Sequence, residues 1–508
     1  LGRPADGASA AMDAADRVRA REPERALRFV ALAQGLDPSS PAYAEAYARA
    51  LAHNGHTEAS VAVRAAVAGR PRDPGGGRGL RLAAAGPAEV AGLHALAATL
   101  LTRAFDREPH LEALYDPLDV DLAQSGDTLE RAILLEEIAA AAPEETRALW
   151  LTRAAGARLD LATDGAWEVE LRARALELDP EHVANLAAIR EQALARDDDR
   201  LLADALERAL TRGRWASASA QAPMLEELAR VAEEALGAPR RAAWAWERLA
   251  AIDPEAPAPP RQLERLRPLL DADAERRAAL EAAAKTPPEG RRLETIRELA
   301  DHLRDDPEAR LRAISLYREV LDAVPDATRA SDALERLLRL EADDYQEAKA
   351  LARRAQNAER RGDRLRVLAR LAALQVLRRD LREAAIVCRQ ILAELPTHRE
   401  ASIRLRRAAC RLRDRDLLRE ALAAEAQVPL PPAARARVMT ALALELELAS
   451  SVEEALSCAE AALAADPSSS EAALLVARHL PHADEPRAAL RVVREIFGDS
   501  PPMLAAWA

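Results

Sequence analysis

The chain has 508 residues, a formal net charge of −12, 49% hydrophobic residues and only 3% aromatic residues. An apolar content this high can bury a large core, which excludes a wholly disordered chain. The negative charge argues against attraction of the whole chain to nucleic acid or anionic lipid. No run of about 18 uninterrupted apolar residues occurs, so we expect no membrane span.

Residues 7–20 and 22–36 are expected to form the first two helices, and they resemble the second half of a longer repeating unit. The chain starts at Leu1, and residues 1–20 contain no basic segment followed by an apolar core. A secretory signal peptide has that pattern, so we expect none and predict a cytoplasmic protein. Because the repeat is already interrupted here, we expect the sequence to be a fragment of a longer chain.

A proline that follows an apolar or acidic helix end recurs through the chain at a nearly constant spacing. The successive intervals are 71, 71, 74, 71, 71 and 71 residues. Proline lacks the N–H group that a helix needs and clashes with the preceding turn, so it marks joints between helices. Further prolines halve most units, which predicts pairs of helices of roughly 13–16 residues. The extra three residues are expected in the loop near 213–223. The recurring prolines are Pro38, Pro109, Pro180, Pro254, Pro325, Pro396 and Pro467.

Alanine stands twelve residues before each of these prolines except in one unit, where Glu168 takes its place. A larger residue follows four positions later in every repeat with this alanine except the last, which has Ala459. Residues four apart share one helix face, so the small residue lets a neighbouring helix approach while the larger one fills the gap beside it. The alanines are Ala26, Ala97, Ala242, Ala313, Ala384 and Ala455, and the later positions hold Val30, Leu101, Arg172, Trp246, Tyr317, Cys388 and Ala459.

This combination of alanine, bulky residue and proline resembles the second helix of a tetratricopeptide repeat. Segments 242–254, 313–325 and 459–467 carry the resemblance best, whereas first helices such as 365–377 match the family less well. The resemblance implies an all-α fold, a right-handed α-α superhelix of about 14 antiparallel helix pairs, in which the first helices line a concave groove. We therefore expect residues 1–508 to form a single continuous solenoid.

Residues 70–91 form the weakest part of the repeat because they are rich in glycine and proline. These residues break or shorten helices, so we predict an irregular, mobile loop near 71–79. The glycine run at 74–79 is superficially similar to a phosphate-binding loop. No lysine follows it and no strand precedes it, however, so we interpret it as a linker.

The histidines and cysteines show no catalytic or metal-binding spacing. His53 and His56 lie in a predicted turn without further ligands nearby, and a zinc site needs four. Cys388, Cys410 and Cys458 form no close pair, so we expect no disulfide framework and interpret each as a small apolar core residue. We expect no catalytic residue, metal, cofactor or small-molecule ligand.

Between Arg353 and Arg419 there are 19 arginines and only 8 acidic residues. Three of the arginines flank the apolar stripe of one predicted helix, and two lie on the preceding first helix. Arginine binds carboxylates and phosphates through paired hydrogen bonds, so one interpretation is a site for an acidic peptide or protein. The simpler alternative is a solvated face in an arginine-rich protein. We expect reversal of Arg404, Arg407 and Arg411 to glutamate to leave folding nearly unchanged. The candidate partner-binding residues are Arg366, Arg370, Arg404, Arg407 and Arg411.

Three functions are considered for such a chain. A non-catalytic scaffold that binds a peptide or partner protein in the concave groove agrees best with the repeat. A regulatory or sensor arm of a larger enzyme or transcription regulator is the alternative, since the repeat is interrupted at both ends and the final segment leaves Met503, Leu504 and Trp507 without a neighbouring helix. A nucleic-acid-binding array through 353–419 is opposed by the overall charge and by the lack of aromatic residues there.

Overall fold

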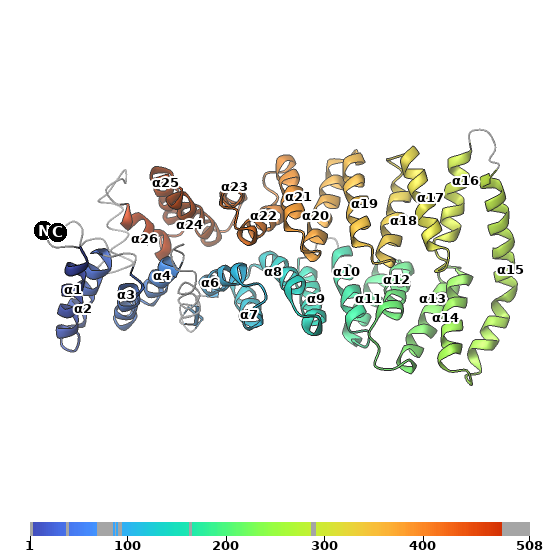
Figure 1. The fold of residues 1–508 in the computed structure, drawn as a ribbon, viewed down its shortest axis with the longest axis horizontal. Coiled ribbons are helices and arrows are strands. Elements are labelled where there is room, and N and C mark those ends of the chain that lie inside the picture. Colours follow the sequence, from blue (N-terminus) through green and yellow to red (C-terminus); the bar gives the residue numbers. More distant parts are fainter. Residues whose placement is uncertain are drawn as a thin grey trace. The chain divides into compact units, whose positions relative to one another are not determined.

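The computed structural model is all-α in the part of the chain that it describes, as the sequence predicts (Figure 1). Among these residues, no helix has the length and apolar character needed to cross a membrane. The predicted loop at 71–79 and the C-terminal Met503, Leu504 and Trp507 lie outside the described residues. The described residues are 4–36, 40–68, 85–86, 88–89, 94–161, 165–285 and 291–479.

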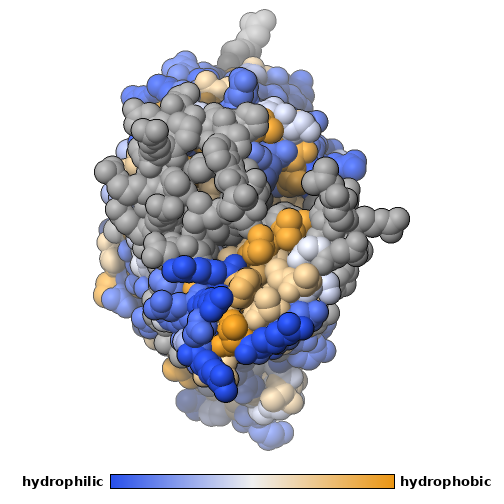
Figure 2. Space-filling view, turned by 90° about the vertical axis from the view of Figure 1, so that its left-hand side faces the viewer, coloured by the Kyte–Doolittle hydropathy of each residue, from blue (hydrophilic) through white to orange (hydrophobic). Residues whose placement is uncertain are grey.

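One compact unit combines both terminal parts of the chain, Leu1–Arg131 and Cys388–Ala508. Apolar residues of its early and late helices, including Tyr47 and Leu456, share one buried cluster. At the α1–α2 end an apolar band lies between hydrophilic side chains (Figure 2). Its helices are α1 (Pro4–Val18), α2 (Pro23–Leu36), α3 (Pro41–His53), α4 (Thr57–Ala68), α6 (His94–Arg107), η1 (Glu112–Leu114), α7 (Tyr115–Ser125), α22 (Arg399–Leu412), α23 (Arg415–Ala426), α24 (Pro432–Leu448), α25 (Val452–Ala465) and α26 (Ser470–Arg478).

The other unit, Ala132–Val387, is a hairpin of two helical arms. We call α9–α14 the outgoing arm and α16–α20 the returning arm, and α15 connects them. Helices α8 (Thr128–Ala141) and α21 (Leu381–Glu394) span the boundaries of the two units. The remaining helices are α9 (Glu144–Leu159), α10 (Ala166–Leu178), α11 (Val183–Arg196), α12 (Asp199–Arg212), η2 (Ser219–Gln221), α13 (Ala222–Glu234), α14 (Pro239–Ile252), α15 (Ala258–Lys285), α16 (Arg292–Leu303), α17 (Arg310–Ala323), α18 (Thr328–Leu340), α19 (Asp344–Asn357) and α20 (Arg361–Leu377).

The alanine and proline positions predicted from the sequence have the expected places in the described chain. Each recurring proline from Pro109 to Pro467 lies in the turn that follows a helix. The alanines twelve residues earlier are buried, and Ala97, Ala242 and Ala313 have no exposed surface. With only a methyl group at these positions, the neighbouring helix packs against the backbone at close range. The connection between α12 and α13, where the extra residues were expected, contains the short helix η2.

The turns inside several pairs combine a left-handed residue with a capping carboxylate. Asp197 has φ 53° and precedes Asp198, whose carboxylate accepts a hydrogen bond from the backbone N of Leu201 at 3.3 Å. Ala342 has φ 52° and precedes Asp343, which caps α19 in the same way. The left-handed residue ends one helix, and the cap satisfies a free N–H at the start of the next. The chain therefore reverses within two residues, which makes the two helices antiparallel.

Helix α15 departs from this pattern. The regular repeat predicts two helices between Pro254 and the next joint, but the structure has a single helix of 28 residues. Because the left-handed Ala342 lies in a turn, the 71-residue repeat predicts an equivalent turn at Asp271. Asp271 lies inside the continuous helix, so the prediction of a regular pair is wrong. No glycine or proline interrupts residues 269–285, and the helix formers there continue one helix. Ion pairs hold its C-terminal half, including Arg277 with Asp306 at 3.1 Å.

The buried alanines allow a test of the packing. We expect Ala313→Trp to lower the free energy of unfolding by about 1–3 kcal/mol, because the indole does not fit between the two helices without moving them. Urea unfolding followed by circular dichroism measures the change. Ala278→Trp, on the exposed face of α15, is the matched control and should be nearly neutral. Equal losses in both variants would contradict close packing at Ala313.

Candidate functional site

The 71-residue repeat in which Glu168 replaces the alanine has charged residues at buried positions of α10. Glu168 and Arg172 are both buried, and the Arg172 guanidinium pairs with the Glu168 carboxylate. Arg172 also donates through Nη1 to Oδ1 of Asn185 at 3.3 Å, and the Asn185 amide donates to Oγ1 of Thr152 at 2.8 Å. This chain of polar contacts joins α10 to α11 and α9. The sequence signal for it is the replacement of alanine by Glu168, which our site prediction did not use.

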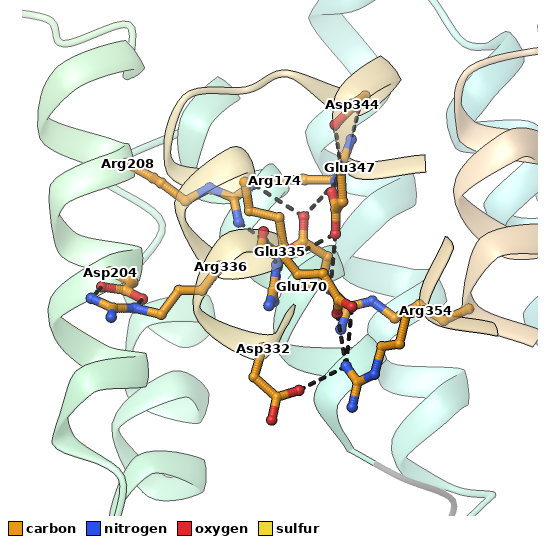
Figure 3. Close-up of polar contacts among 12 residues, drawn as sticks. Glu170, Arg174, Asp204, Arg208, Asp332, Glu335, Arg336, Asp344, Glu347 and Arg354 are labelled. Carbon is orange, nitrogen blue, oxygen red and sulfur yellow. Dashed lines mark hydrogen bonds and ion pairs between the residues drawn. The ribbon is translucent and has the colours of Figure 1, made fainter. Parts of the chain in front are cut away.

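A second set of buried charges on α10 reaches the returning arm (Figure 3). The carboxylate of Glu170 accepts hydrogen bonds from Arg174 Nε at 2.7 Å and from Arg208 Nη1 at 2.8 Å. The other two nitrogens of Arg174 donate to both carboxylate oxygens of Asp344 at 2.9 and 2.7 Å. Arg174 therefore connects α10 with the first turn of α19, 170 residues later in the chain.

The carboxylates of Glu170 and Glu347 lie in the same network but titrate differently. Burial by itself raises the pKa of Glu170, but the charges of Arg208 and Arg174 outweigh it and hold this pKa well below its ordinary value. Burial also raises the pKa of Glu347, and here the opposing charges, among them Arg370, do not compensate. Glu347 still accepts a hydrogen bond from Arg370 Nη2 at 3.0 Å. The guanidinium groups thus favour the ionised form of Glu170 more strongly than that of Glu347.

Helix α12 makes a parallel set of contacts with the returning arm. Asp204 accepts hydrogen bonds from Arg241 Nη2 at 2.9 Å and from Arg336 Nη2 of α18 at 3.0 Å. Burial opposes ionisation of Asp204, but these two guanidinium groups keep its pKa well below its ordinary value. One turn later, the buried Glu207 pairs with Arg310 of α17. The second helices of two successive pairs, α10 and α12, therefore face the returning arm with paired charges.

We call these residues the ionic seam. Its members carry both signs of charge, and Arg339 of α18 also lies near Glu170 at 3.9 Å and Glu347 at 3.4 Å. Each carboxylate therefore lies beside one or more guanidinium groups. Such an arrangement holds two helical surfaces in register. In the described part of the chain, no group of three or more His, Cys, Asp or Glu residues is placed to hold a metal ion. The seam consists of Glu170, Arg174, Asp204, Glu207 and Arg208 on the outgoing arm, and of Arg310, Arg336, Arg339, Asp344 and Glu347 on the returning arm.

The Glu168–Arg172 pair provides a test of how buried charge contributes to stability. We expect Arg172→Leu to lower the free energy of unfolding by about 3–5 kcal/mol, because it leaves the Glu168 charge buried without its partner. The double variant Glu168→Ala with Arg172→Leu restores the alanine and bulky residue of the other units. It should be neutral or stabilising by about 1–4 kcal/mol. Urea denaturation compares the three proteins, and a double variant as unstable as the single one would contradict this account.

Two of the five predicted binding arginines, Arg366 and Arg370, lie on α20. The Arg366 side chain is 70% exposed and pairs with Asp363 of its own helix. The Arg370 side chain is half-buried beside the ionic seam, where it binds Glu347. Arg366 is thus the more accessible of the two to an external carboxylate.

The other three predicted arginines lie on α22 in the unit formed by the terminal parts. Arg404 and Arg407 are buried. Arg404 pairs with Glu400 at 2.9 Å, and Arg407 pairs with Asp106 of α6 at 2.8 Å. Arg411 lies over the ring of Phe105 at 5.9 Å. The expected placement of Arg404 and Arg407 on an open groove face is wrong, because both side chains are buried, Arg407 against helix α6. The partner-binding role of the five arginines stays a prediction.

The burial of Arg407 also changes the expected effect of its reversal to glutamate on folding. We expect Arg407→Glu to lower the free energy of unfolding by about 3–5 kcal/mol, because it places a carboxylate next to Asp106 without a counter-charge. Arg366→Glu, at an exposed site, should change it by less than about 0.5 kcal/mol. Thermal and urea unfolding of the two variants checks this difference. If Arg407→Glu unfolds like the wild-type chain, Arg407 is not buried against α6.

The cysteines are only partly as the sequence predicts. Cys388 is buried, as expected for a small apolar core residue, while Cys410 and Cys458 are half-buried. Burial raises the pKa of the Cys388 and Cys410 thiols to about 12. A thiol with a pKa this high is protonated at neutral pH and is a weak nucleophile.

No protein-family model and no curated protein matches this sequence. Similar solved structures include yeast Tom70, which is 12% identical, covers 98% of this chain and 94% of its own, and has a TM-score of 0.23. The complex of Naa15/Naa10 bound to HypK-THB has 13% identity, coverage of 99% and 90%, and a TM-score of 0.22. The TPR domain of P58(IPK) has 14% identity, coverage of 80% and 98%, and a TM-score of 0.16. We assign no partner or activity from TM-scores this low, and the tetratricopeptide resemblance rests on the repeat and on the observed helix pairs.

Proposed function

We propose that this chain is a non-catalytic scaffold that binds a partner protein. The observation that carries the proposal is an exposed apolar surface on α9 and α11, the first helices of two consecutive pairs. Leu149 and Leu159 of α9 are 49% and 52% exposed, and Val183 and Leu194 of α11 are 76% and 83% exposed. Single exposed apolar residues are ordinary, but four large ones on neighbouring helices are typical of an interaction surface.

Helix geometry groups two of these side chains on one face. Val183 and Leu194 are eleven residues apart, which returns them to nearly the same face of α11 about 16 Å apart along its axis, whereas Leu149 and Leu159, ten residues apart, differ by about 80° around α9. The hydrogen bond from Asn185 to Thr152 holds α11 beside α9. This register places Val183 level with Leu149 and Leu194 level with Leu159 along the helix axes, with Val183 and Leu194 about half a turn around α11 from Asn185, on the side of α11 away from α9.

Helix α9 has open space at Gly156, seven residues after Leu149 and on nearly the same face. A Cβ atom placed on Gly156 would meet no heavy atom within 4 Å. On α11, an amphipathic helix of a partner can place apolar side chains over Val183 and Leu194, with its central residues over the exposed Ala187. We therefore propose a helical segment of a partner protein as the ligand of this surface.

An acidic partner is a finer proposal, and it depends on different residues. The exposed Arg366 is the member of the predicted set best placed to donate two hydrogen bonds to an external carboxylate. Its present partner, Asp363, lies on the same helix and is itself exposed to solvent, so exchange for another carboxylate costs little. The regulatory-arm and nucleic-acid hypotheses stay predictions.

Photo-crosslinking tests the proposed surface. A photoreactive residue at Ala187, on the exposed face of α11, should capture a specific protein that the same residue at Ala278 of α15 does not capture. The affinity of the captured protein is then measured with purified components. We expect Leu149→Ser with Val183→Ser to weaken binding by about tenfold or more, equivalent to at least about 1.4 kcal/mol.

The matched control is Leu311→Ser on α17. Leu311 is also a highly exposed leucine, but it lies outside the proposed surface. This variant should bind like the wild-type chain, and all variants should keep the helical circular dichroism spectrum. If the double variant binds with unchanged affinity, the partner does not use α9 and α11.

A further inference from the structure

Ion pairs join distant segments in both compact units, and the apolar clusters are arranged differently in the two. In the unit formed by the terminal parts, helices α2–α4 and α24–α26 contribute to one apolar cluster. In the unit 132–387, one cluster draws on α10–α15, and another is centred on α16–α18. Helix α15 contributes to both, through Leu266 to the first and through the partly buried Leu280 to the second.

The contacts of the ionic seam cross from one arm of this unit to the other. Arg174 pairs with Asp344, Arg336 with Asp204 and Arg310 with Glu207. Arg200 of α12 also pairs with Asp305, at the end of the returning arm that is nearer to α15, at 2.8 Å. Several of these side chains keep some solvent contact; Asp204, for example, is 16% exposed. Water and ions therefore reach the edges of the seam.

Separation of charged surfaces has a different free energy from separation of apolar ones. Two buried opposite charges attract each other, but each has lost its hydration, and the two effects largely cancel. When the surfaces part, each charge regains water, whereas parted apolar surfaces gain nothing comparable. Dissolved salt weakens the remaining attraction, since the Debye length falls from about 10 Å at about 0.1 M to about 3 Å at about 1 M.

We propose that the ionic seam is a conformational switch: the outgoing and returning arms part along it, between α15 at one end and α8 and α21 at the other, while each arm stays folded. Helix α15 remains attached to both arms because each arm's apolar cluster includes some of its residues. After separation, the facing surfaces of the two arms expose the arginines and carboxylates that were paired across the seam. This switch goes beyond the proposed scaffold function and does not depend on the apolar surface of α9 and α11.

Carboxyl footprinting of the whole chain tests the switch. The protein is labelled with a carbodiimide and glycine ethyl ester at about 0.1 M and about 1 M sodium chloride, and mass spectrometry measures the labelling rate of each carboxylate. We expect Asp204 and Glu207 to react about threefold faster or more at high salt, because the returning arm no longer covers them.

Glu227 is the matched internal control. It is 13% exposed and pairs with Arg190 through two hydrogen bonds within the outgoing arm. Salt weakens that pair as well. A similar rise in the labelling rates of Glu227 and Asp204 would therefore show that ion pairs loosen without separation of the arms, and it would overturn the proposal. No rise at Asp204, or a loss of helical circular dichroism at the same salt concentration, would also overturn it.

A variant shifts the switch without disturbing either arm. Asp344→Asn removes one of the ion pairs between the arms, the pair with Arg174, while Arg174 keeps Glu170 as a partner on its own helix. We expect half-maximal labelling of Asp204 at about half the salt concentration needed for the wild-type chain. Arg190→Gln removes a doubly bonded pair within one arm and should leave this midpoint unchanged. A shift in Arg190→Gln equal to that in Asp344→Asn would count against the seam as the switch.

Discussion

Close approach of neighbouring helices at small residues is the constraint on which the described structure depends. Alanines such as Ala97, Ala242 and Ala313 have no exposed surface, and each is followed four residues later by a side chain that fills the adjacent space. A helix pair cannot bury its apolar flank alone, so each pair needs its neighbour. Left-handed turn residues followed by capping side chains keep the helices of a pair antiparallel. The chain thus extends by repetition of one local contact.

Where the repeated alanine is missing, the character of the structure changes. Glu168 at that position makes α10 polar on its inner side, and its other face contributes Glu170 and Arg174 to the ionic seam. The unit 132–387 therefore combines conventional apolar packing within each arm with charged contacts between the arms. In the other unit a shared apolar cluster joins the first and last helices, alongside ion pairs such as that of Arg407 with Asp106. Charged contacts are weakened by salt and regain hydration when separated, so the two units are expected to differ in how readily their distant segments part.

Part of the fold and of the candidate site could be predicted, and the limits have physical causes. Prolines and alanines mark helix joints and close contacts because their effects on the backbone are local. The continuous helix α15 was missed because residues around Asp271 are compatible with either a turn or a helix. Arg404 and Arg407 were expected on an open face, and periodicity distinguishes the faces of a helix correctly. It does not show which distant helix covers a face, and here α6 covers the part of α22 that carries Arg407.

By itself, the sequence determined the helical class, the joints between helices and the residues at which helices approach closely, because each depends on residues within about one or two helical turns. Only the tertiary structure decided which charges meet. Arg174 and Asp344 are 170 residues apart, a separation that is not a multiple of the 71-residue repeat. Their pairing follows from the reversal of the chain at α15. The surface of α9 and α11 also required coordinates, because exposure of an apolar side chain depends on what the rest of the chain leaves uncovered.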